Sequence, residues 1–177
     1  MKNKKLSIFI IIFILLIVAG YFILFKNKEE VEIANISASS ISRAIKDNIV
    51  FKDELIEIDK DMMSKYYKNI NLENVEDASV YVSASGATTE EIAVFIMKRK
   101  GLVVEAKESI NNRKKDQIES FKNYVPEEVY KIEQSVIKEN ENIVVFVSTH
   151  TPDDVDQILE NVYNGNIKID DTIPKNE

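Results

Sequence analysis

The feature that most constrains this chain is a run of twenty residues, Leu6 to Phe25, without a charged side chain. Sixteen of these residues are Ile, Leu, Val or Phe. As a helix rising about 1.5 Å per residue, the run is roughly 30 Å long, which matches the hydrocarbon core of a bilayer. The sequence therefore predicts a single membrane-spanning anchor over residues 6–25.

The charges flanking this run predict its orientation. Three lysines precede it, and two follow it before the first acidic residue. Excess positive charge stays on the cytoplasmic side, so residues 1–5 are expected inside and the C-terminal domain outside the cell membrane. A cleaved signal peptide is the alternative, because Ala19 and Gly20 are small residues that a peptidase accepts. The apolar run continues to Phe25, however, which favours an uncleaved signal-anchor.

Composition excludes several classes of protein. The chain has no cysteine, so it has neither disulfides, nor thiolate metal sites, nor a lipid-modified cysteine. Three of the 23 basic residues and none of the 30 acidic residues precede the run, which leaves a net charge of −10 for the remainder. Nucleic acids require a concentrated basic surface. We therefore expect no nucleic-acid partner.

Hydrophobic periodicity predicts one α+β domain over residues 37–173, between a spacer at 26–36 and a tail at 174–177. Helices are expected from Ser37, from Asp59, over 103–124, from Pro126 and from Thr151. Two-residue alternation or short apolar runs predict strands at 78–85, 92–97 and 143–147. The expected fold is a two-layer sandwich, with a small sheet of three or so strands covered by helices on one face.

Most catalytic signatures are missing from the sequence. The three glycines outside the predicted anchor fall at turns or helix ends, which leaves none for a phosphate-cradling loop. His150 is the only histidine, and no acidic cluster has the spacing of a calcium loop. We therefore predict no catalytic residues, no cofactor and no metal, and the chain is not expected to be an enzyme.

One helical stripe breaks the apolar pattern. Steps of three and four residues from Val103 bring Arg113 and Gln117 onto the face that also carries Phe121. A guanidinium on the core side needs a partner, because an unpaired buried charge is costly. Glu91, at the start of a predicted strand, is the expected partner. A buried ion pair and a pocket in which Arg113 receives an anionic ligand are both compatible with this pattern.

Two motifs carry a resemblance to a known family. One is S-G-A-T-T-E-E-I-A-V-F within the stretch Tyr81–Phe95, and the other is the spacing R-x3-Q-x3-F-x2-Y-x-P that begins at Arg113. Together they resemble bacterial membrane-anchored proteins and lipoproteins catalogued as domain of unknown function 4358, roughly from Ser37 to Val147. This resemblance implies one anchored, exported domain and implies no reaction.

The function expected from these observations is a non-catalytic binding or interaction module at the outer face of the cell membrane. Its partner is expected to be a protein or another envelope component. The alternatives are a domain that binds a small anionic ligand, or a hydrolase that uses a polar pocket around Arg113. A deep pocket containing Glu91 and Arg113 favours ligand binding, whereas a flat, filled surface favours protein interaction.

Overall fold

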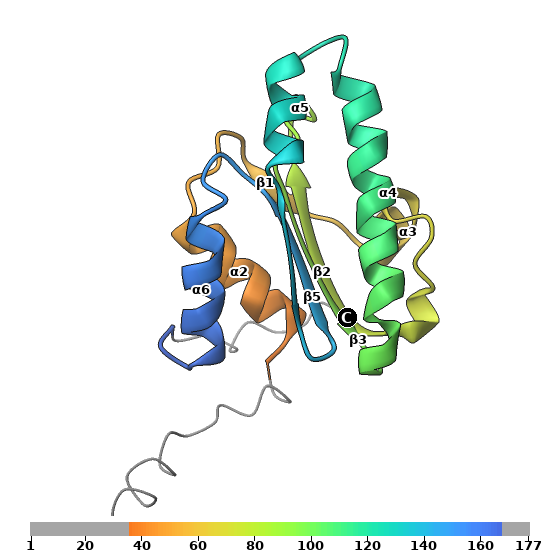
Figure 1. Cartoon of the computed structure of the whole chain (residues 1–177), viewed down its shortest axis with the longest axis vertical. Coiled ribbons are helices and arrows are strands. Elements are labelled where there is room, and N and C mark those ends of the chain that lie inside the picture. Colours follow the sequence, from red (N-terminus) through yellow and green to blue (C-terminus); the bar gives the residue numbers. More distant parts are fainter. Residues whose placement is uncertain (1–35, 168–177) are drawn as a thin grey trace, which may run out of the picture. The chain divides into compact units, whose positions relative to one another are not determined.

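The computed structural model describes residues 36–167, which lie within one compact unit (Figure 1). The helices and strands are α2 (Ala38–Asn48), β1 (Leu55–Glu57), α3 (Lys60–Tyr66), β2 (Val75–Ser83), β3 (Glu91–Met97), α4 (Val103–Phe121), α5 (Pro126–Glu133), β4 (Val136–Asn140), β5 (Ile143–Ser148) and α6 (Asp154–Tyr163). The predicted anchor at 6–25, nearly all of the spacer and the tail at 174–177 lie outside the described residues. Among the helices of residues 36–167, none has the length and apolar character needed to cross a membrane.

The sheet has five strands in the order β1-β2-β3-β5-β4, and every neighbouring pair is antiparallel. The predicted α+β class is therefore confirmed, but the expected number of strands was too small. The two strands that sequence reasoning missed, β1 and β4, are the edge strands. β1 is only three residues long, and β4 carries the charged residues Lys138 and Glu139 among its five residues.

Helices cover both faces of the sheet, so the expected two-layer arrangement is wrong and the domain has three layers. α2 and α6 lie on one face, and α3, α4 and α5 lie on the other (Figure 1). Side chains alternate along β3, and Ala93, Phe95 and Met97 pack into the core beneath α4. Ile92 and Val94 are buried on the opposite face. The continuous apolar sequence of β3 follows from this coverage on both sides.

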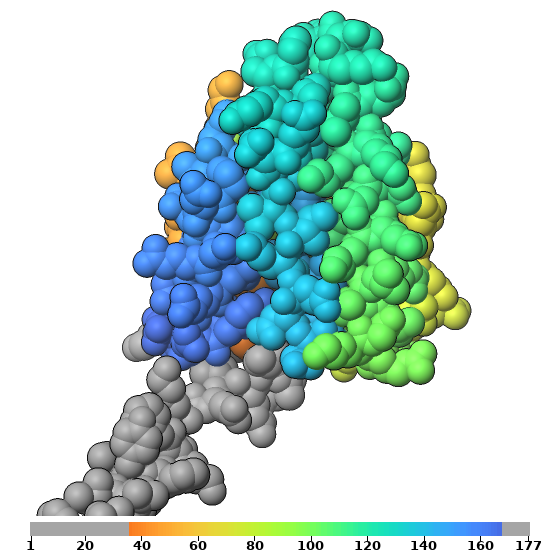
Figure 2. All heavy atoms as spheres, viewed as in Figure 1, coloured from red at the N-terminus to blue at the C-terminus, as the bar shows by residue number. Residues whose placement is uncertain are grey.

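Two charged side chains of the edge strand β4 pair with helices on opposite faces of the sheet. Lys138 pairs with Asp156 of α6 at 2.7 Å, and Glu139 pairs with Lys107 of α4 at 3.0 Å. In Figure 2 the green residues of α4 and the blue residues of α6 lie on either side of the cyan and light-blue residues of α5 and β4. Charged side chains at this exposed edge also discourage pairing with another chain.

The helix boundaries follow from local chemistry. Of the two serines that the sequence offers as caps for the first helix, Ser37 and Ser39, the structure uses Ser37, whose side chain accepts a hydrogen bond from Ser40 N. Asp59 caps α3 in the same way, as predicted. Pro126 occupies the first turn of α5, as predicted. The spacing of Val129, Ile132, Val136 and Ile137 in the sequence predicts one continuous apolar helix face. That prediction is wrong, because α5 ends at Glu133 and Val136 pairs with Val147 of β5.

Candidate functional site

The structure brings together the three residues singled out in the sequence. Glu91 is the first residue of β3, and its side chain, 1% exposed, points toward α4. Arg113 Nη2 donates to Glu91 Oε2 at 2.8 Å, and Arg113 Nε donates to the same oxygen at 3.1 Å. Gln117, one turn further along α4, donates from Nε2 to that oxygen at 3.0 Å. The predicted ion pair is present, with Gln117 as a third member.

Two consecutive tyrosines of the α3 region complete this cluster. The buried Tyr67 hydroxyl donates to Glu91 Oε1. Burial and the charge of Glu91 both raise the pKa of Tyr67 well above its usual value. The Tyr66 ring lies 4.4 Å from the guanidinium carbon of Arg113, which is a cation–π distance. Burial is the largest single influence on Arg113 and lowers its pKa, but the charge and hydrogen bonds of Glu91, together with Tyr67 and Tyr66, outweigh it, so the net pKa is raised.

A cavity of about 160 Å³ adjoins this cluster. Among its lining residues are Arg113, Gln117, Val82, Phe121 and Gly86. Gly86 is exposed, so the cavity opens to solvent. Gln117 is only 4% exposed, and its Oε1 accepts no hydrogen bond from any residue between 36 and 167. A buried acceptor left unpaired costs about 1–3 kcal/mol, and the hydroxyls of Ser109 and Ser148 are two further buried groups without a partner among the described residues.

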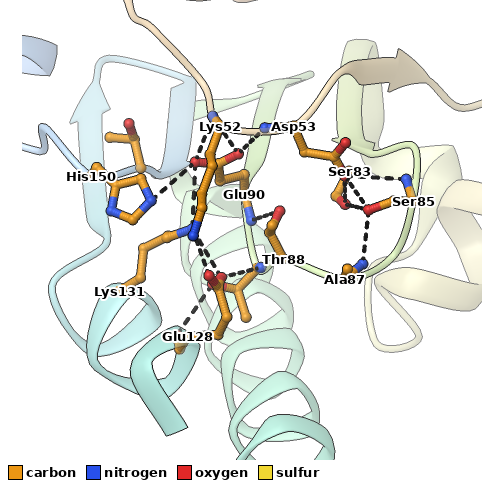
Figure 3. A network of polar contacts seen from close by, with 12 residues as sticks. Lys52, Asp53, Ser83, Ser85, Ala87, Thr88, Glu90, Glu128, Lys131 and His150 are labelled. Carbon is orange, nitrogen blue, oxygen red and sulfur yellow. Dashed lines mark hydrogen bonds and ion pairs between the residues drawn. The ribbon is translucent and has the colours of Figure 1, made fainter. Parts of the chain in front are cut away.

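A second cluster of buried charge begins at the neighbouring residue, Glu90, which is 1% exposed. Its carboxylate accepts hydrogen bonds from the backbone amides of Lys52 and Asp53, each at 2.9 Å (Figure 3). Lys131 Nζ lies 3.4 Å from the same carboxylate. His150 Nε2 lies 3.6 Å away on a side chain that is 50% exposed. The only histidine of the chain is therefore a surface neighbour of a carboxylate that already has three closer partners.

Lys131 links Glu90 to a third buried carboxylate, Glu128, one turn earlier on α5. Lys131 Nζ lies 2.9 Å from Glu128, and Thr89 N donates to Glu128 at 2.7 Å (Figure 3). Burial alone raises the pKa of Glu128. The hydrogen bonds from Thr89 and Lys131 outweigh that effect, so the pKa of Glu128 lies below its usual value. This cluster ties α5 to the residue that precedes Glu90.

Asp53 completes a reciprocal clasp around the loop that joins β2 to β3. Glu90 holds the backbone of Asp53, while the Asp53 carboxylate accepts hydrogen bonds from the Ser83 hydroxyl and the Ser85 amide (Figure 3). The bonds from the two serines lower the pKa of Asp53 to about 2. Because Ser83 and Gly86 line the cavity, the clasp fixes one wall of the site.

The chemistry of these clusters suits recognition. Glu91 is held by Tyr67, Arg113 and Gln117, and Glu90 is held by two backbone amides and Lys131, so both carboxylates already have several donors. Within residues 36–167, no group of three or more His, Cys, Asp or Glu side chains is arranged to hold a metal ion. The groups with spare hydrogen-bonding capacity lie on Arg113 and Gln117.

Fold and site together define a three-layer α+β domain with a small polar cavity between α4 and the loop that joins β2 to β3. The chain belongs to the family described as Domain of unknown function (DUF4358), whose model matches residues 47–149. The matched residues include both charge clusters and the cavity. No curated protein and no solved structure matches the chain. The resemblance found in the sequence is confirmed, while membrane anchoring stays a prediction.

Proposed function

We propose that this protein is a non-catalytic binding module at the outer face of the cell membrane, and that it takes a small, uncharged polar ligand in the cavity beside Arg113 and Gln117. The observation that carries the proposal is the open cavity itself, which is lined by the polar side chains of Arg113 and Gln117 beside the apolar Val82 and Phe121. A cavity that combines a few polar groups with an apolar wall is typical of sites that bind small molecules.

An uncharged ligand fits the electrostatics better than an anion. The positive charge of Arg113 is already met by Glu91, through contacts of 2.8 and 3.1 Å. Glu90 also lines the cavity and adds a further negative charge. An anion entering here must displace Glu91 from its partner, which leaves a buried carboxylate unpaired. This favours a neutral ligand over the anionic ligand considered from the sequence.

Binding is also favoured over catalysis by the state of the carboxylates. A general base must be free to accept a proton from a substrate. Glu90 and Glu91 instead accept several hydrogen bonds each and hold the walls of the cavity in place. A site held rigid in this way is pre-organised, which reduces the cost of ordering side chains when a ligand binds.

The proposed location rests on the sequence. The uncharged run at 6–25 is long enough to span a bilayer, and the lysines before it favour a cytoplasmic N-terminus. Protease added to intact cells, stripped of any wall, should therefore digest residues 36–167. Protection of this region until the cells are lysed would reverse the orientation.

Ligand binding can be tested by NMR on the full chain in detergent micelles. A panel of small neutral compounds, containing polyols, sugars, alcohols and amides, is titrated while the side-chain amide of Gln117 and Nε–H of Arg113 are followed. We expect at least one compound to shift both signals in a saturable manner. If every compound leaves both signals unchanged, the cavity is not a binding site for this class of ligand.

A further inference from the structure

Phe121 contributes an aromatic ring to the cavity that the core does not use. The residue is only partly buried, and it belongs neither to the described core cluster beneath α4 nor to the side chains packed against that cluster. Among residues 36–167, no ring contact or cation–π contact involves it. Tyr66, the other aromatic residue of the lining, is already in contact with Arg113. Phe121 therefore offers an apolar surface that a ligand in the cavity can cover.

Two hydroxyl groups of the lining also have hydrogen-bonding capacity to spare. Thr88 Oγ1, in the loop that joins β2 to β3, accepts from Glu90 N at 3.4 Å, and its own proton is donated to no residue between 36 and 167. Ser120, on α4, donates its hydroxyl proton to Asp116 O at 2.8 Å, so its oxygen can still accept. Thr88 is partly buried and Ser120 is exposed. A ligand therefore meets a donor on the loop and an acceptor on the helix.

Building on the proposed function, we propose that the ligand is a neutral sugar, one pyranose ring of which enters the cavity. A pyranose carries C–H groups on the faces of a rigid ring, which cover Phe121, and hydroxyl groups around its edge. Each hydroxyl both donates and accepts, so one sugar ring can accept from Thr88 and donate to Ser120. Because the ring is rigid, few torsions are frozen when it binds. The charges of Glu91 and Arg113 stay paired.

The size of the cavity limits how much of a sugar it holds. Its volume of about 160 Å³ equals roughly five water molecules at ~30 Å³ each, which is room for about one pyranose ring. Further rings of a longer chain must lie outside, at the mouth, where Gly86 and Ser120 are exposed. A Cβ atom at Gly86 would meet no other atom within 4 Å, so this side of the mouth is open.

Other neutral compounds use this lining less completely. Sorbitol, a linear polyol, has the hydroxyl groups but no rigid apolar face for Phe121, and it loses many torsions on binding. Tetrahydropyran-4-ol has the ring, but it brings a single hydroxyl to the two sides of the cavity. These two compounds are the matched comparisons, because each keeps one half of what a pyranose offers.

The experiment titrates the full chain in micelles of dodecylphosphocholine, a detergent without a sugar, and follows binding by NMR. The probes are the methyl pyranosides of glucose, galactose and mannose, with sorbitol and tetrahydropyran-4-ol for comparison. We expect at least one pyranoside to bind at least about fivefold more tightly than either comparison compound, because each of these lacks one set of contacts. The C–H protons of the bound pyranoside should shift upfield, because they lie over the ring of Phe121.

The source of the sugar is read from the length of the probe. Tighter binding by a disaccharide of the preferred sugar identifies a glycan chain that continues past the mouth. Equal binding of the disaccharide and the methyl pyranoside identifies a free sugar. Both results support the inference.

Two variants locate the contact. Phe121→Leu keeps an apolar side chain but removes the ring, so it should weaken pyranoside binding at least about threefold and abolish the upfield shift. Tyr124→Leu is the matched control, because Tyr124 is an exposed aromatic residue that follows α4 and does not line the cavity. If Phe121→Leu does not fold, nuclear Overhauser effects between the sugar and the Phe121 ring of the parent protein test the same contact.

The outcomes separate this inference from the proposed function. A preferred pyranoside whose protons shift upfield in the parent protein, and not in Phe121→Leu, supports both. Equal or tighter binding of sorbitol or tetrahydropyran-4-ol, with shifts at Arg113 and Gln117, keeps the proposed function and overturns the sugar inference. Pyranoside binding that leaves Phe121 unaffected also overturns it. The absence of any shift at Arg113 and Gln117, with every compound, overturns both.

Discussion

Replacing Arg113 by alanine tests whether the ion pair between Arg113 and Glu91 stabilises the fold. Glu91 is almost completely buried, so removing its partner leaves a charge without its main compensation. Breaking a buried ion pair costs about 3–5 kcal/mol. Tyr67 and Gln117 continue to donate to Glu91, which places this cost near ~3 kcal/mol. Loss of the contact with the Tyr66 ring adds about 0.5–1 kcal/mol.

Urea unfolding of the unit Ala34–Glu177, followed by far-ultraviolet circular dichroism, measures this cost. The chain has no tryptophan, so circular dichroism is a stronger signal than fluorescence. With a slope of about 1–3 kcal/mol per molar urea, Arg113→Ala should lower the midpoint by roughly 1–4 M. Lys68→Ala is the control, because it breaks the exposed Lys68–Asp116 pair at 3.1 Å and should cost under about 1 kcal/mol.

A double-mutant cycle assigns the effect to the pair itself. In the background of Glu91→Gln, the charge that Arg113 compensates is gone, so Arg113→Ala should cost about 2 kcal/mol less than in the parent. An Arg113→Ala protein with the same midpoint as Lys68→Ala would refute the buried pair. Equal costs in the two backgrounds would show that Arg113 acts through packing alone.

Three further predictions concern the other polar contacts. The pKa of Glu128 is lowered in the folded state, so its contribution to stability is present above about pH 4.5 and is lost as the pH falls through the folded value. Glu128→Gln should therefore be less stable than the parent at pH 7, and the urea midpoints of the two proteins should converge as the pH falls below the usual pKa of a glutamate, about 4.5. A difference that stays constant as the pH is lowered would contradict the assignment. Asp53→Asn should loosen the loop that joins β2 to β3, because the acceptor for the Ser83 hydroxyl and the Ser85 amide is weakened. Hydrogen exchange at the Ser85 amide should become at least severalfold faster, and unchanged exchange would show that the clasp does not hold the loop. Tyr67→Phe removes one donor from buried Glu91 and should cost about 1–3 kcal/mol in urea unfolding, whereas a change below about 0.5 kcal/mol would mean that Arg113 and Gln117 suffice.

The contact between Arg113 and Glu91 could be predicted because two independent constraints pointed to it. The periodicity of α4 placed Arg113 on the apolar face, and the cost of an unpaired buried charge required an acidic partner. The starts of two helices could be predicted equally well, because the side chains of Ser37 and Asp59 accept hydrogen bonds from free backbone amides of the first turn. Each of these inferences depends on chemistry within one element, or on one strong energetic penalty.

The edge strands and the second helical layer could not be predicted from the sequence in the same way. A strand such as β4 gains its hydrogen bonds from β5, and its Lys138 and Glu139 are typical of a solvated segment. Nothing local distinguishes it from a loop or from the end of α5. Periodicity identifies the buried face of a helix but does not say which side of a sheet that face covers, so three layers were reduced to two.

The cluster around Glu90 was missed for a related reason. Glu128 and Lys131 are three residues apart on α5, a spacing that normally forms an exposed pair. Their burial depends on Thr89 and Glu90, which arrive from a distant part of the chain. Such a cluster has no signature in sequence spacing, because the desolvation of each charge is compensated only after the tertiary structure has formed.

The neighbouring carboxylates of Glu90 and Glu91 connect the two clusters at the start of β3. Glu91 points toward α4 and fixes Arg113 and Gln117, while Glu90 fixes the Lys52–Asp53 backbone and thereby the clasp on the loop. One dipeptide thus holds both Arg113 and Gln117 on one side of the cavity and the loop that forms its other wall. Two adjacent buried carboxylates are costly to fold, and a core needs neither of them to be charged. Their joint effect is to keep two walls of one small cavity rigid, which is the arrangement that a selective binding site requires.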